Sequence, residues 1–268
     1  MNSRTTPSRS NDERRRSALT RRRFGVAAAC TLMSTIFDDA CAFTGAAPAN
    51  DPRLSARPRR DVQNSLASGR LGLSDGARDA MIQWPSAPPD GPVPLLVFLH
   101  GATQNGAGML RRVGPAAEQA GVAVLAPDSR AMTWDAIRGT FSEDVEFLNR
   151  ALEHVFARAA IDPARVAVGG FSDGASYAIS LGLANGDLFP RVVACSPGFV
   201  IPVQPNGRAR FFISHGTSDQ ILPIDQCSRV IVPRLRALDH DVTFHEFEGR
   251  HEVPPAIAEE ALRWVAAR

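Results

Sequence analysis

The sequence contains no lysine, and all 30 basic residues among its 268 are arginine. Schiff-base chemistry, serine–lysine hydrolysis and the phosphate-binding P-loop each need a lysine amine or ammonium group, so these mechanisms are excluded. Net charge is also small, at +2. Residues 1–42 hold eight arginines and four acidic residues, which leaves 22 basic and 24 acidic residues downstream. This near-neutral body argues against a nucleic-acid partner.

Cysteine is scarce, with four residues. Neither Cys30 nor Cys41 follows a convincing lipobox, so lipidation is not expected. For Cys195 and Cys227 two readings stay open: a disulfide, which an even count permits in an oxidising compartment, or free thiols in the core. No cysteine–histidine cluster has metal-ligand spacing, and we expect neither a metal nor another cofactor.

The amino-terminal segment resembles a twin-arginine export signal. A polar leader precedes Arg21-Arg22-Arg23, and an apolar stretch follows from Gly25 to Phe37. This stretch is too short to span a bilayer comfortably, so no stable membrane anchor is expected. Ala40-Cys41-Ala42 offers a cleavage site, and Ala47-Pro48-Ala49 a later one. We expect residues 1–42 to be a signal peptide and the mature protein to be periplasmic or secreted; an arginine-rich tail or a misassigned start codon is the alternative.

The rest of the chain predicts one α/β domain over residues 71–268. Residues 43–70 are polar and poorly periodic, and we interpret them as a linker or loosely packed lead-in. Continuous apolar runs such as Pro94–Leu99 are typical of strands buried on both faces, and amphipathic stretches such as 142–160 predict helices between them. This alternation predicts a mostly parallel central sheet with helices on both faces. Expected strands lie at 79–84, 94–99, 122–126, 191–195, 211–214 and 242–247, with another leading into Ser172.

The run from Val166 to Ser176 contains the motif Gly-x-Ser-x-Gly around Ser172. A strand pattern precedes the motif and a helix-forming stretch follows it, which is the context of a nucleophile elbow. Gly170 and Gly174 flank the serine because a side chain there would collide with the neighbouring strand or helix. Ser172 is therefore the candidate nucleophile.

A serine nucleophile needs a base, and the base needs an orienting carboxylate. Reactive groups gather at the carboxyl ends of parallel strands. Downstream of Ser172, Asp219 follows the strand at 211–214 and His251 follows the strand at 242–247. The chain order serine, aspartate, histidine is that of an α/β-hydrolase, and it favours Asp219 over the competing acids Asp128 and Asp173. Asp225, six positions after Asp219, is the nearer rival and would also suit a helix amino terminus.

The predicted oxyanion donors are the backbone N–H groups of Ala102 and Asp173. Ala102 lies in the turn after the first buried strand, and Asp173 directly follows the nucleophile. We interpret His100 as a brace for this turn rather than as the base, and the remaining histidines as structural or solvated. Three large apolar residues are either core or acyl-pocket residues: Trp134, Phe199 and Val200.

Together these pieces resemble the small carboxylesterase/phospholipase-type branch of the α/β-hydrolases, near acyl-thioesterase-like and dienelactone-hydrolase-like enzymes. The resemblance covers about Pro94 to Arg268. It implies a serine esterase that cleaves small-molecule carboxylic esters through an acyl-enzyme. The matching pieces are His100-Gly101 and the segments 170–174, 215–223 and 249–253.

The chain departs from the acyl-thioesterase branch directly after the serine. That branch usually has glutamine there, whereas this chain has Asp173, so thioester specificity does not transfer. Two enzyme alternatives remain open: an acyl-thioesterase, and an exported polyester or feruloyl-type depolymerase. The non-enzyme alternative is a binding protein with a degenerate hydrolase fold. The short segment 196–209 leaves no room for a large cap domain, which predicts an open site.

Overall fold

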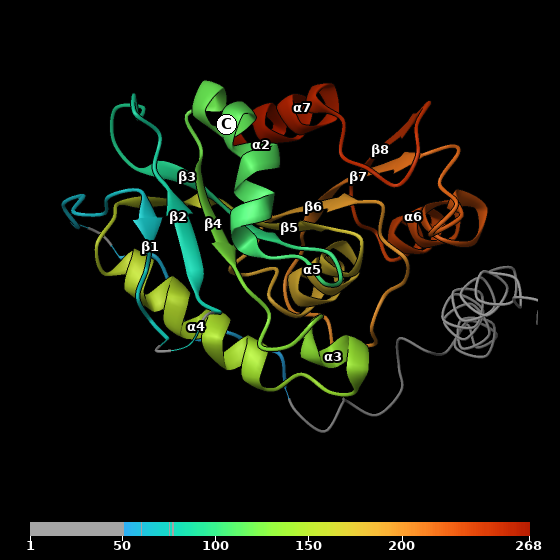
Figure 1. Ribbon diagram of the computed structural model, residues 1–268, viewed down its shortest axis with the longest axis horizontal. Helices are drawn as coiled ribbons and strands as arrows, with labels where there is room; N and C mark the ends of the chain where they lie inside the picture. The colour runs from blue at the N-terminus through green and yellow to red at the C-terminus, as the bar shows by residue number, and fades with distance from the viewer. Residues whose placement is uncertain (1–50, 60, 75, 77) are drawn as a thin grey trace, which may run out of the picture. The chain divides into compact units, whose positions relative to one another are not determined.

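The computed structural model describes residues 51–268 apart from positions 60, 75 and 77 (Figure 1). These residues belong to the unit Phe43–Arg268. The expected signal segment and both of its cleavage sites lie outside the described residues. Within the described part, no helix is long and apolar enough to cross a membrane.

An eight-stranded sheet runs through the described part of the chain, in the order β1-β2-β4-β3-β5-β6-β7-β8. The strands from β4 to β8 in this order pair in parallel, and β1 and β2 add an antiparallel edge. The mostly parallel α/β fold predicted from the sequence is confirmed. The strands are β1 (Gly69–Arg70), β2 (Ala80–Gln83), β3 (Val93–Leu99), β4 (Ala123–Pro127), β5 (Ile161–Phe171), β6 (Arg191–Cys195), β7 (Arg210–Gly216) and β8 (Val242–Phe247).

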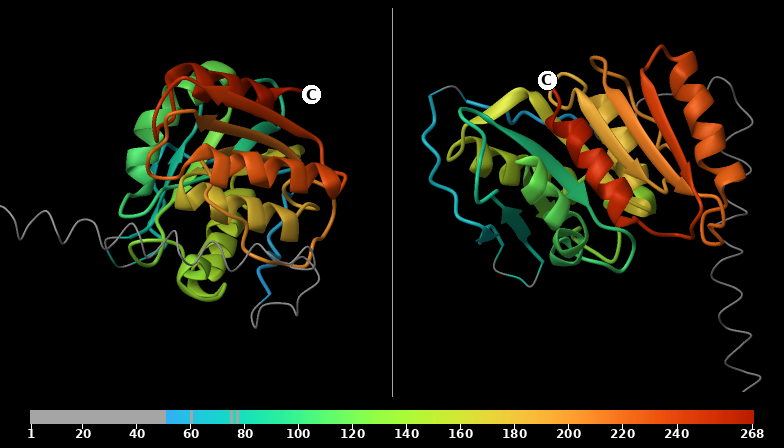
Figure 2. Two further views of the ribbon diagram at one scale, coloured as in Figure 1. Left: turned by 90° about the vertical axis from the view of Figure 1, so that its right-hand side faces the viewer. Right: turned by 90° about the horizontal axis from the view of Figure 1, so that it is seen from above.

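Helices cover both faces of the sheet because its central strands are apolar on both sides. In β3, Leu95 and Val97 point into one core and Leu96 and Phe98 into the other. Helices α2 and α7 pack on one face, and α4, α5 and α6 on the other (Figure 2). The helices are α2 (Gly106–Ala120), α3 (Asp135–Arg138), α4 (Glu143–Phe156), α5 (Asp173–Ala184), α6 (Ser228–Ala237) and α7 (Pro255–Ala266), with a 3₁₀ turn η1 (Ile224–Gln226).

The structure differs from the sequence prediction at a few element ends. Helix α4 stops at Phe156 rather than near Ala160, because Ala160 binds the start of β3. Its carbonyl accepts from Val93 N–H at 2.8 Å, and its N–H donates to Asn64 Oδ1 at 2.8 Å. The sequence did not predict β1 or α3, since two and four residues are too few to show a periodicity.

Residues 51–59, interpreted above as part of a linker or loose lead-in, pack on the domain. Leu54 is buried in the core, and its N–H donates to the side chain of Asn185 at 2.7 Å. Two further N–H groups of this segment donate to the side chain of Asn149 at 2.8 and 2.9 Å. Asparagine side chains thus satisfy the backbone of a polar segment whose sequence shows no regular pattern.

Cys195 and Cys227 are both buried and no disulfide joins them, so the bridge that the sequence left open is not formed. Burial raises the pKa of Cys195 to about 11, which keeps its thiol protonated and unreactive. The segment 196–209 between β6 and β7 has no helix or strand, so no cap domain is inserted at this point.

Candidate active site

The predicted site residues meet at one edge of the sheet, where the parallel strands end. Ser172 follows β5, Asp219 lies in the loop after β7, and His251 lies in the loop after β8. The turn 100–102 follows β3, and a Cβ atom built on Gly101 would lie 3.2 Å from Cβ of Ser172. The parallel register explains this convergence, because the carboxyl ends of these strands lie side by side.

Ser172 sits on a strained turn between β5 and α5. Its φ and ψ are 58° and −122°, a backbone conformation that costs a non-glycine residue about 1–3 kcal/mol. The two flanking glycines are required by close approach: a Cβ on Gly170 would lie 2.4 Å from the carbonyl carbon of Gly174, and a Cβ on Gly174 would lie 2.3 Å from the oxygen of Leu99. The elbow predicted from the motif is therefore formed.

Asp219 and His251 form a hydrogen-bonded pair. The Nδ1 atom of His251 lies 2.6 Å from Oδ2 of Asp219. The other carboxylate oxygen accepts the N–H groups of Ile221 and Leu222 at 2.9 and 2.8 Å. An ionised carboxylate only accepts, so Nδ1 of His251 carries the proton and Nε2 is left as an acceptor.

The ring of His251 packs against the residue before the nucleophile. Its centroid lies 4.6 Å from that of Phe171, and the side chain is 15% exposed. Among the described residues, no hydrogen bond joins the Ser172 hydroxyl to His251. Catalytic hydrogen bonds often shorten only when substrate binds, so this geometry is compatible with a serine–histidine pair.

The competing carboxylates of Asp225 and Asp128 have other partners. Asp225 is exposed on η1 and pairs with Arg229 at 2.7 Å. Asp128 accepts the N–H groups of Gly106 and Asp79 at 2.7 and 3.1 Å, so it ties together the loops beside β4. Asp219 is the carboxylate that meets His251.

His215 lies behind Asp219, a contact that sequence reasoning did not predict. Its Nε2 atom lies 3.3 Å from Oδ2 of Asp219 and 2.8 Å from the carbonyl oxygen of Leu222, which can only accept. Nδ1 therefore accepts from the Ser228 hydroxyl at 2.7 Å. Burial lowers the pKa of His215 and favours this neutral form. The signal in the sequence is its spacing, four residues before the acid.

Two backbone N–H groups near Ser172 have no acceptor in the loops and turns of the described chain. Outside helices and strands of the described chain, neither Ala102 N–H nor Asp173 N–H donates to an acceptor. The imidazole of His100 donates from Nδ1 to the Gly101 carbonyl at 2.7 Å and accepts Ser129 N–H at Nε2 at 2.9 Å. Both ring nitrogens are engaged, so His100 braces the turn and cannot serve as the base. Burial lowers its pKa and favours the neutral ring.

Three large apolar residues were expected to belong either to the core or to an acyl pocket. Of these, Trp134 belongs to the core. It is 1% exposed, and its Nε1 donates to the His100 carbonyl at 2.8 Å. Val200 is half-buried against the core, and Phe199 is half-buried in the loop after β6. In the described part of the chain, no three histidine, cysteine or acidic residues are arranged to hold a metal ion.

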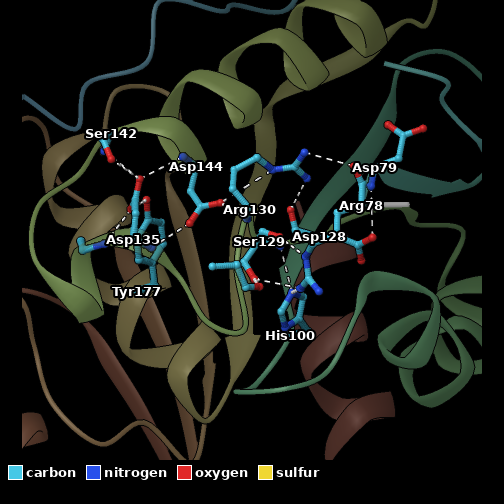
Figure 3. Close-up of polar contacts among 12 residues, drawn as sticks. Arg78, Asp79, His100, Asp128, Ser129, Arg130, Asp135, Ser142, Asp144 and Tyr177 are labelled. Atoms are coloured by element: carbon cyan, nitrogen blue, oxygen red, sulfur yellow. Dashed lines mark hydrogen bonds and ion pairs between the residues drawn. The ribbon is translucent and has the colours of Figure 1, made fainter. Parts of the chain in front are cut away.

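Two buried carboxylates organise the segment between β4 and α4 (Figure 3). Asp144 accepts the N–H groups of Arg130 and Asp135 at 2.6 and 2.7 Å. Asp135 in turn accepts from Asp144 N–H at 2.9 Å and from the hydroxyl of Tyr177 at 2.9 Å. Burial raises the pKa of Asp144 to about 6, against the opposing effect of its two hydrogen bonds.

We expect Asp144→Asn to change how stability depends on pH. Between about pH 4 and about pH 6 the folded protein holds the Asp144 proton and the unfolded chain has lost it. This group therefore lowers the wild-type free energy of unfolding by about 3 kcal/mol as pH rises through that range. Asparagine does not titrate, so the variant should gain stability relative to wild type by a similar amount. Urea unfolding from about pH 4 to about pH 7 measures the difference, and a constant difference would contradict the expectation.

Comparison with known proteins extends these observations. Residues 128–267 match the phospholipase/carboxylesterase family. A putative esterase, NocK, from Nocardia uniformis subsp. tsuyamanensis is 29% identical over 191 residues, which are 66% of this chain and 55% of that protein. The chain thus spans about half the length of this curated relative.

Solved structures share the fold at low sequence identity. A carboxylesterase from Bacillus cereus superposes with a TM-score of 0.54 at 21% identity, covering 71% of this chain and 94% of that one. A truncated carbohydrate esterase from gut microbiota gives a TM-score of 0.60 at 16% identity, covering 78% of this chain and 98% of that one. The resemblance seen in the sequence is confirmed: this chain belongs to the phospholipase/carboxylesterase family and has the α/β-hydrolase fold.

Proposed function

We propose that this protein is a serine esterase that hydrolyses small-molecule carboxylic esters. The observation that carries the proposal is the 2.6 Å hydrogen bond between Asp219 and His251, at the sheet edge where the strained elbow presents Ser172. The parallel register brings the three strand ends together, but it does not require that these ends carry an acid, a base and a nucleophile. Membership in the phospholipase/carboxylesterase family supports the same reaction class.

In the proposed acylation step, Nε2 of His251 takes the proton of the Ser172 hydroxyl while its oxygen attacks the ester carbonyl carbon. Asp219 holds the imidazole in the required tautomer and stabilises the imidazolium that forms. His251 then gives the proton to the leaving alcohol, which leaves an acyl-enzyme on Ser172. Water attacks this acyl group while His251 takes a proton from it. The bond to the Ser172 oxygen then breaks, His251 returns the proton to that oxygen, and the carboxylic acid is released. The reaction needs no cofactor.

The tetrahedral intermediate carries a negative oxygen, which the Ala102 and Asp173 N–H groups are placed to bind. Asp173 is the first residue of α5, so the positive end of that helix adds to the stabilisation. Losing one such donor typically lowers turnover by about 10²–10³-fold.

The proposed substrate site is open, and apolar side chains border it. The Met132 side chain is 71% exposed, and the carbonyl of Met132 accepts from Thr103 N–H in the oxyanion turn. The Ile221 side chain is 56% exposed, and the N–H of Ile221 donates to the carboxylate of Asp219. We expect these two exposed side chains to contact an apolar acyl or alcohol group of the ester.

Covalent trapping tests the proposal. A fluorophosphonate should modify the wild-type protein at Ser172, located by peptide mass spectrometry, and p-nitrophenyl acetate should give a burst of about one equivalent of p-nitrophenol if deacylation is slow. Labelling at a different residue would overturn the assignment. A panel of p-nitrophenyl esters and acyl-thioesters then ranks the substrates, and a preference for thioesters would favour the acyl-thioesterase alternative.

We also propose that the enzyme acts outside the cytoplasm, because its first 42 residues have the arginine cluster, apolar stretch and cleavage pattern of a twin-arginine signal. Fractionation of a bacterial host that expresses the full chain, with replacement of Arg21 and Arg22 by lysine as the control, tests this. Equal periplasmic recovery of both forms would contradict the twin-arginine route.

A further inference from the structure

The segment between β4 and α4, residues 128–142, forms hydrogen bonds on either side of Ala102 and with the side chain of Asp173, the two residues whose N–H groups are the predicted oxyanion donors. We call this segment the Trp134 loop. On one side, the carbonyl of Met132 accepts from Thr103 N–H at 2.7 Å, and the Trp134 indole donates to the His100 carbonyl at 2.8 Å. These two bonds lie on either side of Ala102. On the other side, the Thr133 hydroxyl donates to Oδ2 of Asp173 at 2.6 Å.

The turn that carries Ala102 needs this support. Thr103 has a φ of 63°, a left-handed conformation that is strained for a β-branched residue. Such strain persists only where surrounding contacts impose it, and the bond from Thr103 N–H to Met132 is one of those contacts. The Trp134 loop therefore fixes the orientation of the backbone that presents Ala102 N–H.

The Trp134 loop is itself rigidly anchored (Figure 3). The Trp134 ring is buried between His100 and Tyr177, with centroid distances of 5.0 and 5.3 Å. Asp144 accepts N–H groups from two points along the loop, and Asp135 accepts from Ser142 N–H at its end at 2.7 Å. A loop closed by two buried carboxylates can impose its geometry on the turn it contacts.

The Thr133 contact addresses a problem that Asp173 creates. A carboxylate directly after the nucleophile would repel the oxyanion if it turned towards the ester. None of the ion pairs in the described chain involves Asp173, and its side-chain oxygen accepts from Thr133. This short bond to a charged acceptor holds the carboxylate against the Trp134 loop, and with it the first residue of α5.

We propose that Thr133 is a positioning residue of the oxyanion site, acting through the carboxylate of Asp173, and that the Trp134 loop aligns both donors as one unit. The inference rests on the serine mechanism proposed above. In the described chain, Thr133 forms no hydrogen bond with the nucleophile or the base, so its effect should appear in the stabilisation of the oxyanion and not in substrate binding.

Thr133→Val tests this, because valine keeps the shape of threonine and removes the hydroxyl. We expect kcat for p-nitrophenyl acetate to fall about 10- to 100-fold with KM within about twofold of wild type. Affinity for a trifluoromethyl ketone, whose adduct with serine carries an oxyanion, should fall by the same factor as kcat/KM. Thr133→Ser keeps the hydroxyl and should restore kcat to within about threefold of wild type.

A double-mutant cycle separates this role from a loss of packing. If Thr133 acts through Asp173, Thr133→Val should have no further effect on kcat in an Asp173→Ala background. Thr133 is half-buried, and Thr133→Ala provides a second variant if valine disturbs folding.

An unchanged kcat in both hydroxyl-free variants, a loss confined to KM, or full additivity with Asp173→Ala would overturn the inference. Fluorophosphonate labelling at Ser172 would still stand in each of those cases, so the proposed function would survive. Loss of that labelling in wild type would instead remove the basis of both.

Discussion

Ser172→Ala is expected to reduce kcat for p-nitrophenyl acetate by about 10⁶-fold and to abolish fluorophosphonate labelling. The methyl group cannot form the acyl-enzyme, so the remaining rate comes only from substrate binding and the oxyanion donors. Ser172 is 9% exposed and its hydroxyl has no hydrogen bond among the described residues, so the fold should tolerate the change. Relief of the strained elbow is not expected, because alanine at that position needs the same φ of 58°.

Ser218→Ala is the matched control for this variant. Ser218 is an exposed serine at the same edge of the sheet, next to the proposed acid. Its backbone N–H donates to the Gly249 carbonyl, a bond that alanine keeps. It should keep wild-type kcat and wild-type labelling. Circular dichroism and thermal unfolding verify that both variants are folded. Substantial ester hydrolysis by folded Ser172→Ala would exclude the serine mechanism.

Asp219→Asn is expected to lower kcat by about 10⁴-fold with the backbone unchanged. In the wild type, one carboxylate oxygen accepts the N–H groups of Ile221 and Leu222, and the other accepts from His251. The amide oxygen must keep the two backbone donors, so the amide NH₂ would face Nδ1 of His251. Nδ1 then has to accept, and the ring proton moves to Nε2, where it prevents removal of the Ser172 proton.

Asp225→Asn is the matched control for the acid. Asp225 lies six positions along the chain but is exposed and paired with Arg229. An exposed ion pair contributes little to stability, so this variant should keep its activity and nearly all its stability. Steady-state kinetics of both variants on one ester distinguishes the two carboxylates. A large loss in Asp225→Asn beside an active Asp219→Asn would reverse the assignment.

Several strands were predicted with accurate bounds because their signals are local. Strands β6 and β8 were expected at 191–195 and 242–247 and occupy those residues. Both are short apolar or β-branched runs bounded by breaks in the pattern, so each can be read without knowing its neighbours. The elbow was predictable for the same reason. The close approach at Gly170 and Gly174 requires two glycines, and both lie within the five-residue motif around Ser172.

Long-range polar contacts were not predictable in this way. Thr133 meets Asp173 across 40 residues, and His215 lies against an acid that was expected to meet only His251. The segment 51–59 resembled a linker because it lacks periodicity, yet asparagine side chains from α4 and the end of α5 bind its backbone. Single hydrogen bonds between distant side chains leave no pattern that a sequence window can detect.

The sequence by itself determined the α/β alternation, the parallel sheet and the residue types of the proposed nucleophile, acid and base, since apolar periodicity and flanking glycines act over a few residues. Only the tertiary structure decided how these groups are held. It placed Asp219 rather than Asp225 on His251, made Trp134 a support of the turn that His100 braces, and brought Thr133 to Asp173. These choices depend on which strand ends and loops become neighbours, and that is settled by packing of the whole sheet.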